Sequence, residues 1–425
     1  MLEIKRNAYS KIDWFTLHIN NVSTDFYDVY VYNVYDTGTV WTATAHAVTA
    51  VIGSGVLAVP WSVAQMGWIY GPLSLFGFAI ITYICAILLC DCYRAPDPVK
   101  GQRNPSYMDA VQSTLGKKEV LMCAIAQYSL LWGTMVGYAI TAATSMLSIR
   151  RANCYHKKGP EAVDCEPSGN SFLLIFGAIN MVLSQIPNLE KVTFLSVIAA
   201  TMSICYSFLA LYLCVAKFVS HPDPKGTLTG VEVGSNGLTM TSKLFQSFQA
   251  LGNIAFSYTY AQLLIEIERA TLCSIALTTA FYVSLGCMGY LAFGNDAPGN
   301  VLTAFHEPFW LVDLANIGVV IHLTAAFQAS PTALVMAVTV FTAMMFPFFN
   351  AVLGLMGSIA FFPLTVYLPV RMHLTQVNLK IGGLKWCALQ GLCLVAFVVS
   401  IISAVGSVAD IADRLKHAKL FSADL

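Results

Sequence analysis

The sequence has few charged residues and no excess of either sign. Charged side chains make up 11% of the 425 residues, and 23 basic residues balance 23 acidic ones. Soluble domains carry about 25% charged residues, so this chain lacks the polar surface that a soluble protein of its length needs. Its zero net charge also gives no electrostatic reason to expect nucleic acid or an acidic protein as a partner.

The sequence also lacks the common motifs of metal, nucleotide and nucleophile chemistry. It has twelve cysteines, but none of them forms a CxxC pair or a Cys/His cluster with metal-ligand spacing. There is no Walker sequence, and serine, histidine and aspartate occur in separate apolar segments without a nucleophile motif. We therefore expect neither an enzyme nor an ATP-driven pump, and no metal or organic cofactor.

The first 38 residues lack the apolar centre of a cleavable signal peptide. They mix polar and aromatic residues with charges at Glu3, Lys5, Arg6, Lys11 and Asp13. We expect residues 1–38 to form an N-terminal tail that stays in the cytoplasm, with the first apolar segment acting as the insertion signal.

Long apolar segments dominate the rest of the chain. Hydrophobic residues make up 57% of the sequence, and a helix needs about 20 of them in a row to cross a bilayer. The chain predicts an all-α integral membrane protein with about eleven transmembrane helices, in the spans Thr39–Met66, Trp68–Tyr93, Glu119–Ile149, Ser171–Ile186, Val192–Val219, Leu244–Ile265, Leu272–Phe293, Pro308–Phe327, Thr332–Phe349, Val352–Met372 and Leu384–Val408.

The order of these spans predicts two repeats of opposite orientation. Five spans precede the sixth, and an odd number reverses sidedness, so residues 242–372 are expected to repeat residues 39–219 upside down. Helix 384–408 and a tail at 409–425 follow. Inverted repeats are typical of secondary transporters, whose binding site lies near the bilayer midplane on interrupted helices.

The first span contains a helix-breaking motif, Ile52-Gly53-Ser54-Gly55, followed by Pro60. Each glycine costs helix stability, about 1 kcal/mol relative to alanine. An unwound segment would present backbone N–H groups at the start of a half-helix, where a carboxylate binds favourably. The alternative is close helix packing through small residues.

The sixth span carries a matching motif from Gly252 to Tyr260. It places Asn253, Phe256, Ser257 and Tyr258 within one apolar helix. Aromatic and hydroxyl groups of this kind can cover a substrate and accept hydrogen bonds from its amine. Two interruptions five spans apart favour a binding site over simple packing.

Three ionisable residues in or near these spans are candidates for proton transfer, because charged groups inside a membrane are costly and usually functional. His46 precedes Gly53 by about two helical turns on nearly the same face, Glu266 ends the sixth span, and His322 lies within the eighth. The alternatives are a neutral histidine hydrogen-bonded to a neighbouring helix and, for Glu266, a charge at the membrane interface.

Cys154 and Cys165 differ from the other ten cysteines because they lie in the polar loop between the third and fourth spans. With a cytoplasmic N-terminus this loop faces the opposite, oxidising side. We therefore expect the two residues to form a disulfide.

Several motifs resemble the plant amino acid permeases of the amino acid/auxin permease family, in the APC superfamily. The resemblance covers nearly everything after Asp36 and rests on Thr44-Ala45-His46, Val51–Leu57, Ala64–Trp68, Asp91–Arg94, Tyr107–Val111, Asn153–Lys157 with Cys165, Phe248–Gly252, Leu264–Ile267, Ala297–Asn300, Glu307–Asp313 and Phe361–Tyr367.

This resemblance implies a LeuT-type fold of 5+5 helices and proton-coupled import of amino acids, mainly neutral ones, at the plasma membrane. The substrate carboxylate is then expected at Gly53, Ser54 and Gly55, and the other substrate contacts around Phe256, Ser257 and Tyr258. The proton is the coupling ion, the amino acid and the lipid bilayer are the partners, and no other cofactor is implied.

The sequence also departs from the family pattern. Asn253 stands where the family usually has an aspartate, which makes His46 the leading candidate for proton coupling. The connections at residues 266–271 and 327–332 are short, and the tail before Asp36 looks different. These departures leave an alternative open, a membrane protein that does not transport, either an amino-acid sensor or a truncated remnant of a permease.

Overall fold

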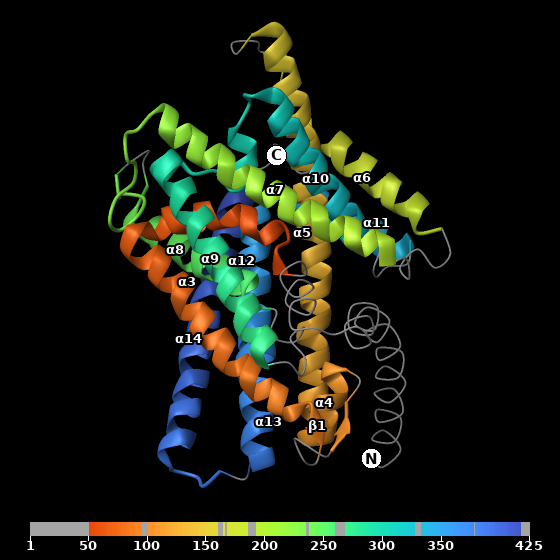
Figure 1. Ribbon diagram of the computed structural model, residues 1–425, viewed down its shortest axis with the longest axis vertical. Helices are drawn as coiled ribbons and strands as arrows, with labels where there is room; N and C mark the ends of the chain where they lie inside the picture. Colours follow the sequence, from red (N-terminus) through yellow and green to blue (C-terminus); the bar gives the residue numbers. More distant parts are fainter. Residues whose placement is uncertain are drawn as a thin grey trace.

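The computed structural model describes residues 51–95, 101–104, 106–159, 165, 168–185, 193–234, 238–259, 268–327, 333–377 and 379–417. Within these ranges the chain is almost entirely helical (Figure 1), which confirms the predicted all-α membrane class. The exception is a two-residue ribbon in which β1 (Arg94–Ala95) pairs antiparallel with β2 (Gln102–Arg103). The helices are η1 (Ser54–Ala58), α3 (Val59–Cys92), α4 (Tyr107–Thr114), α5 (Lys117–Lys158), α6 (Gly169–Leu183), α7 (Thr193–Ser220), α8 (Met240–Ser257), α9 (Glu268–Phe293), η6 (Gly294–Asp296), η7 (Val301–Ala304), α10 (Phe309–Phe327), α11 (Ala333–Met345), α12 (Phe349–Ala360), η8 (Phe361–Tyr367), α13 (Leu368–Val377) and α14 (Leu384–His417).

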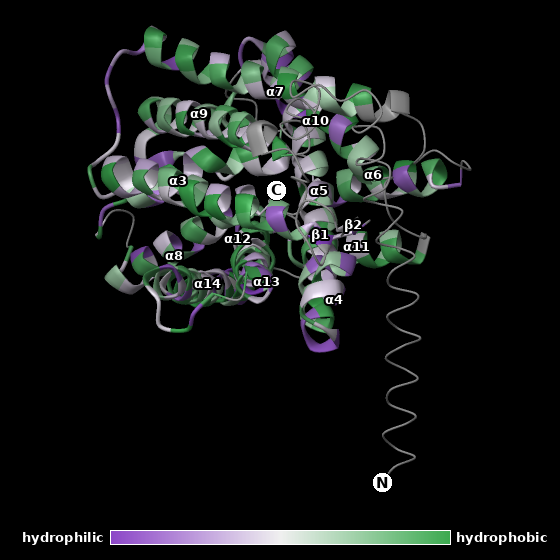
Figure 2. Cartoon of the chain, turned by 60° about the horizontal axis from the view of Figure 1, so that its bottom comes forward, coloured by the Kyte–Doolittle hydropathy of each residue, from purple (hydrophilic) through white to green (hydrophobic). Residues whose placement is uncertain are grey.

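Seven helical segments of the described residues are long and apolar enough to cross a membrane. They keep large apolar side chains on their outer surface, among them Leu73, Ile80 and Leu394, which are 63%, 59% and 63% exposed. Figure 2 shows hydrophilic residues mainly near α4 and in the connecting loops. α6 and α11 are apolar but shorter, so the count of about eleven crossings stays a prediction.

α3 contains a sharp bend at Gly67, the residue between the first two predicted spans. Gly67 has φ 77°, inside the left-handed region that favours glycine. The loop after α7 packs into the bend, where Trp68 N donates to Thr227 O (3.2 Å) and Val231 N donates to Ala64 O (3.2 Å). The loop thus pairs with the backbone groups that the bend releases.

α8 lies at the centre of the helix packing, against α3, α12 and α14. Its crossing with α12 is close because glycines meet there. A Cβ added at Gly357 would overlap Gly252 O and lie 2.5 Å from Phe256 N, and one at Gly354 would lie 3.0 Å from Gln249 O. In Figure 1 the long helix α5 runs vertically beside this group, and α10 and α12 pack against it.

α12 continues into α13 through the π-helical turn η8, which contains Pro363. A π-turn leaves some carbonyls without their usual helical partners. Tyr107 Oη donates to one of them, Leu364 O, over 2.8 Å. A side chain from α4 therefore supports the turn.

Candidate functional site

The backbone is not α-helical between Ile52 and Ala58. The chain bends at Ile52 and Gly53 and then forms the short 3-10 helix η1. Gly53 N donates to Val51 O (2.9 Å), and Val56 N donates to Gly53 O (3.3 Å). Ser54 is almost completely buried, at 2% exposure, so this irregular backbone lies inside the protein, which is where the membrane interior tolerates it.

The end of α8 forms the second irregular segment. Tyr258 leaves the helical region, with φ −106° and ψ 6°, and its N–H is shared between Ile254 O and Ala255 O. Ser257 and Tyr258 are both buried, at 6% and 0% exposure. The helix thus ends at Ser257, inside the predicted sixth span.

These two segments lie against each other. A Cβ added at Gly55 would lie 3.3 Å from the Phe256 ring carbons Cδ1 and Cε1 and 3.3 Å from Ser257 Oγ. A glycine at this position therefore allows η1 to approach the end of α8 closely. This contact brings together three of the predicted site residues, because Gly55 meets Phe256 and Ser257, which lie more than 200 positions later in the chain.

Hydroxyl groups from α3 and α9 bind the backbone carbonyls of both segments. Tyr282 Oη lies 3.1 Å from Val51 O and 3.5 Å from Ser257 O. Thr82 Oγ1 donates to Tyr258 O (3.3 Å). These bonds fix the position of one segment relative to the other.

Gly53 faces a different set of groups. The position of a Cβ at Gly53 lies 3.7 Å from Tyr138 Oη of α5 and 4.0 Å from His322 Nε2 of α10, the nearest atoms of other elements among the described residues. His322 is buried, and its Nδ1 lies 2.8 Å from Ala199 O. Because a carbonyl only accepts hydrogen bonds, Nδ1 carries the proton, and Nε2 is the nitrogen that faces Gly53.

The structure places the remaining predicted residues as follows. Ile52 is buried at 4% exposure. Asn253 is also buried, but its Oδ1 lies 3.1 Å from the Cβ position at Gly354, on the side of α8 that meets α12. The proton-transfer candidates His46 and Glu266 lie outside the described residues.

Sequence reasoning missed the three hydroxyl residues that surround the site, Thr82, Tyr138 and Tyr282. Each lies in a long helix that spans the membrane by length and composition, beside other hydroxyl residues, and belongs to no motif. The available signal was weak, because a hydroxyl group inside an apolar span more often bonds to its own helix. Their position beside η1 and the end of α8 follows only from the packing of α3, α5 and α9 in the folded protein.

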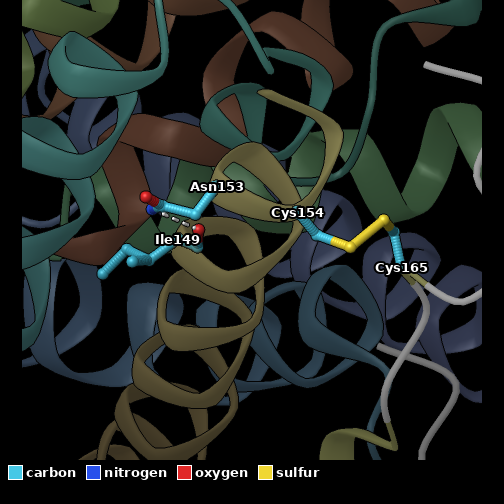
Figure 3. The surroundings of a disulfide bond; sticks show 4 residues. All are labelled: Ile149, Asn153, Cys154 and Cys165. Carbon is cyan, nitrogen blue, oxygen red and sulfur yellow. Dashed lines mark hydrogen bonds between the residues drawn. A yellow bond between two sulfur atoms is a disulfide. The ribbon is translucent and has the colours of Figure 1, made fainter. Parts of the chain in front are cut away.

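The predicted disulfide residues lie beyond this site, at the end of α5. Cys154 and Cys165 form a disulfide with an S–S distance of 2.01 Å (Figure 3). The neighbouring Asn153 donates to Ile149 O (2.9 Å) and to Asp313 Oδ2 (2.6 Å). The loop is thus attached to α5, and α5 to the start of α10.

Comparison with known proteins gives consistent matches along the chain. A family model described as transmembrane amino acid transporter protein matches residues 36–333 and 329–412. The chain is 43% identical to amino acid permease 1 of Arabidopsis thaliana over 91% of each chain, and 42% identical to amino acid permease 8 of the same plant over 91% of this chain and 93% of that protein. Among solved structures, MhsT in complex with L-phenylalanine aligns with a TM-score of 0.46 and 12% identity, over 86% of this chain and 98% of MhsT.

Proposed function

The chain belongs to the transmembrane amino acid transporter family, and on this premise we propose that it is a proton-coupled secondary transporter that imports mainly neutral amino acids across the plasma membrane. The resemblance to plant amino acid permeases is confirmed by these matches. We further propose the LeuT-type arrangement of two inverted five-helix repeats, in which the first and sixth helices are interrupted and the N-terminus is cytoplasmic.

The observation that carries this proposal is the meeting of η1 with the end of α8. Gly55 packs against Phe256 and Ser257, while Gly53 faces Tyr138 and His322, which a Cβ there would meet at 3.7 and 4.0 Å. In the proposed complex, N–H groups of the segment Ile52–Gly55 bind the substrate carboxylate.

The other face of the substrate is proposed to lie against the end of α8. In this proposal Phe256 covers the side chain of the substrate, and oxygen atoms of Ser257 and Tyr258 accept hydrogen bonds from the amine of the substrate. Asn253 is proposed to support this end of α8, since Ser257 Oγ donates to Asn253 O over 3.1 Å.

The preference for neutral amino acids is supported by the uncharged surroundings of the two glycines. Within the described part of the chain, the groups nearest to Gly53 and Gly55 are the side chains of Tyr138, His322, Phe256 and Ser257. None of them carries a permanent charge. A charged substrate side chain would therefore lack an ionic partner among them and would bear the cost of leaving water.

For proton coupling, His322 is the candidate that the described structure supports best. Its Nε2 faces the same space as Gly53, so a proton on this nitrogen and a carboxylate at Gly53 would stabilise each other. His46 and Glu266 remain candidates on sequence grounds alone.

The alternative, a remnant or sensor that does not transport, is not favoured by the comparisons. The matches to amino acid permeases 1 and 8 extend over 91% and 93% of those proteins. A strongly truncated copy would match a smaller share.

Uptake in cells that lack their own amino acid transporters tests the proposal. Cells expressing this protein are expected to accumulate labelled neutral amino acids more strongly at pH 5 than at pH 8. His322→Gln, which is similar in size but does not titrate in this range, is expected to flatten the pH dependence. Absence of uptake by protein that has reached the cell surface would contradict the proposal, and an unchanged pH profile would exclude His322 as the coupling group.

A further inference from the structure

A row of buried polar side chains lies where α8 packs against α14, one to two turns before the end of α8 that meets η1. We call it the α8–α14 seam and define it by Gln249 and Asn253 of α8 and Ser400, Ser403 and Ser407 of α14. All five are buried, with exposures between 0% and 9%. Gln249 Oε1, both amide atoms of Asn253 and the three serine hydroxyls have no hydrogen-bond partner among the described residues.

The spacing of these residues puts each set on one face of its own helix, and a Cβ at Gly406, on the same face of α14, would lie 2.8 Å from Gln249 N of α8. Gln249 and Asn253 are four residues apart, and the serines of α14 are three and four apart, so each set forms one stripe. α8 and α14 pack directly on each other. A Cβ at Gly354 would lie 2.6 Å from Ser407 Oγ and 3.1 Å from Asn253 Oδ1, so these two oxygens converge beside α12.

Several other buried hydroxyls among the described residues bond to their own helix, although Ser145, Ser207 and Thr278 lack a partner as the seam serines do. Ser62 Oγ donates to Ala58 O (3.1 Å), Thr141 Oγ1 to Gly137 O (2.8 Å) and Ser148 Oγ to Thr144 O (2.9 Å). The seam serines do not, although the same bond is available to any helical serine. Their hydroxyls are therefore left available to a partner outside their own helix.

Leaving these groups unpaired would be costly. Each buried polar group without a partner costs about 1–3 kcal/mol, and the seam has six such atoms. Buried water commonly binds groups of this kind, making about three hydrogen bonds per molecule. Water fits better than a metal ion because the amide and the hydroxyls offer donors as well as acceptors, whereas a cation accepts only oxygen ligands.

The seam has a polar group at each end. At one end, Gln249 Nε2 donates to Asp410 Oδ2 (3.1 Å), which also accepts from Arg414 Nε (2.8 Å). Arg414 is 47% exposed, so this end reaches the surface. At the other end, Ser257 Oγ binds Asn253 O, and Ser257 faces Gly55.

We propose that the α8–α14 seam binds a file of water molecules that leads from Asp410, next to the exposed Arg414, to Ser257 behind the proposed substrate site. Water in hydrogen-bonded contact can pass protons, so the seam is a proton route that is separate from the path of the amino acid. The presence of water follows from the seam itself, while its use in coupling rests on the proposed function.

Thiol accessibility tests the presence of water. Ser407→Cys and Ser403→Cys are each compared with Val405→Cys, a position on the same helix that is 49% exposed on its other side. The purified protein in lipid nanodiscs is treated with a small methanethiosulfonate reagent, and modification is read by mass spectrometry on the α14 peptide, where Cys387 and Cys393 serve as internal references. The cysteine thiolate attacks the sulfur of the reagent, forms a mixed disulfide and releases methanesulfinate. Because the thiolate forms only where water is present, we expect Ser407→Cys to react at least about tenfold faster than Val405→Cys, with Ser403→Cys between them. Equal rates at positions 407 and 405 would overturn the proposal.

Proton flux tests the route. Gln249→Leu keeps the size of the side chain and removes its polar atoms, and Gln185→Leu, at an exposed position after α6, is the control. In proteoliposomes containing a pH-sensitive dye, we expect Gln249→Leu to reduce amino-acid-driven proton entry about tenfold, while amino acid exchange without a pH gradient stays within about twofold of the native rate. If the seam cysteines react rapidly but proton entry in Gln249→Leu is unchanged, the seam contains water but is not the proton route. If the native protein carries no protons, the proposed coupling fails, but the thiol rates still decide whether the seam is wet.

Discussion

The two sides of α8 are built in opposite ways. Toward η1, its irregular end meets Gly55, and its carbonyls at Ser257 and Tyr258 lie beside hydroxyls from Tyr282 and Thr82. Toward α12 and α14, the backbone crosses other helices at glycines, but six polar atoms of the seam side chains lack partners among the described residues, although Gln249 Nε2 donates to Asp410 Oδ2. The carbonyls on the first side thus have partners within the protein, and most polar side-chain atoms of the seam do not.

This difference suggests two roles for one helix. Paired carbonyls hold the site in a defined geometry before substrate arrives, which lowers the cost of binding. Unpaired groups require a mobile partner such as water. The glycines differ as well, because those at the α12 crossing let backbones touch, whereas a Cβ at Gly53 would meet only side-chain atoms at ordinary contact distances.

The largest effect is expected from Gly357→Ala at the α12 crossing. The new Cβ would overlap Gly252 O and lie 2.5 Å from Phe256 N, so backbone atoms must move, and overpacking of this kind costs about 1–3 kcal/mol or more. We expect a marked loss of folded protein, measured as surface amount and thermal midpoint. Gly77→Ala is the control, since a Cβ there meets nothing within 4 Å. If both variants lose the same amount of folded protein, the α8–α12 crossing is no more sensitive to an added methyl group than the position of Gly77.

Gly53→Ala is expected to separate folding from function. Its methyl group would lie 3.7 Å from Tyr138 Oη and 4.0 Å from His322 Nε2, ordinary contact distances, so the protein should fold and reach the membrane normally. The methyl occupies the space assigned to the substrate carboxylate, and we expect uptake to fall about tenfold or more, equivalent to about 1.4 kcal/mol. Normal uptake would place the carboxylate elsewhere.

Much of the fold follows from hydropathy. The helical segments α7 and α10 begin and end within one residue of the predicted spans, because apolar length is a local property. The boundary between the first two predicted spans does fall at Gly67. That it is a bend within α3 supported by the loop after α7, and that a π-turn supported by Tyr107 of α4 forms at Phe361–Tyr367, could not be predicted, since both supports come from distant parts of the chain.

The candidate site could be predicted only in part. Gly53, Gly55, Phe256 and Ser257 were found because glycine and polar residues interrupt apolar runs. The orientation of the Asn253 side chain could not be predicted from the sequence, because it depends on which helix packs against that face of α8. The structure turns its side chain toward Gly354.

Tyr282→Phe tests whether the paired side of α8 is held by its hydroxyl contacts. The substitution keeps the ring and removes the hydroxyl that lies 3.1 Å from Val51 O and 3.5 Å from Ser257 O. Loss of a buried hydrogen bond costs about 1–2 kcal/mol, so we expect uptake to fall about fivefold to tenfold at similar surface amount. Tyr212→Phe, at a position that is 60% exposed, should leave uptake unchanged. A similar effect in both variants would remove the argument for a fixed geometry.

The smallest effect on thermal stability is expected from Ser407→Ala. Comparing this variant with Thr82→Val distinguishes the two sides of α8 most directly. Thr82→Val keeps its shape but leaves Tyr258 O without the hydroxyl that donates to it, so it should destabilise the protein by about 1 kcal/mol, the usual size of an interhelical hydrogen bond in membranes. Ser407→Ala removes a hydroxyl that has no protein partner in the described structure, so its thermal midpoint should stay close to that of the native protein. If Ser407→Ala instead lowers the midpoint as much as Thr82→Val does, the seam is held by direct protein contacts, and the contrast between the two sides of α8 disappears.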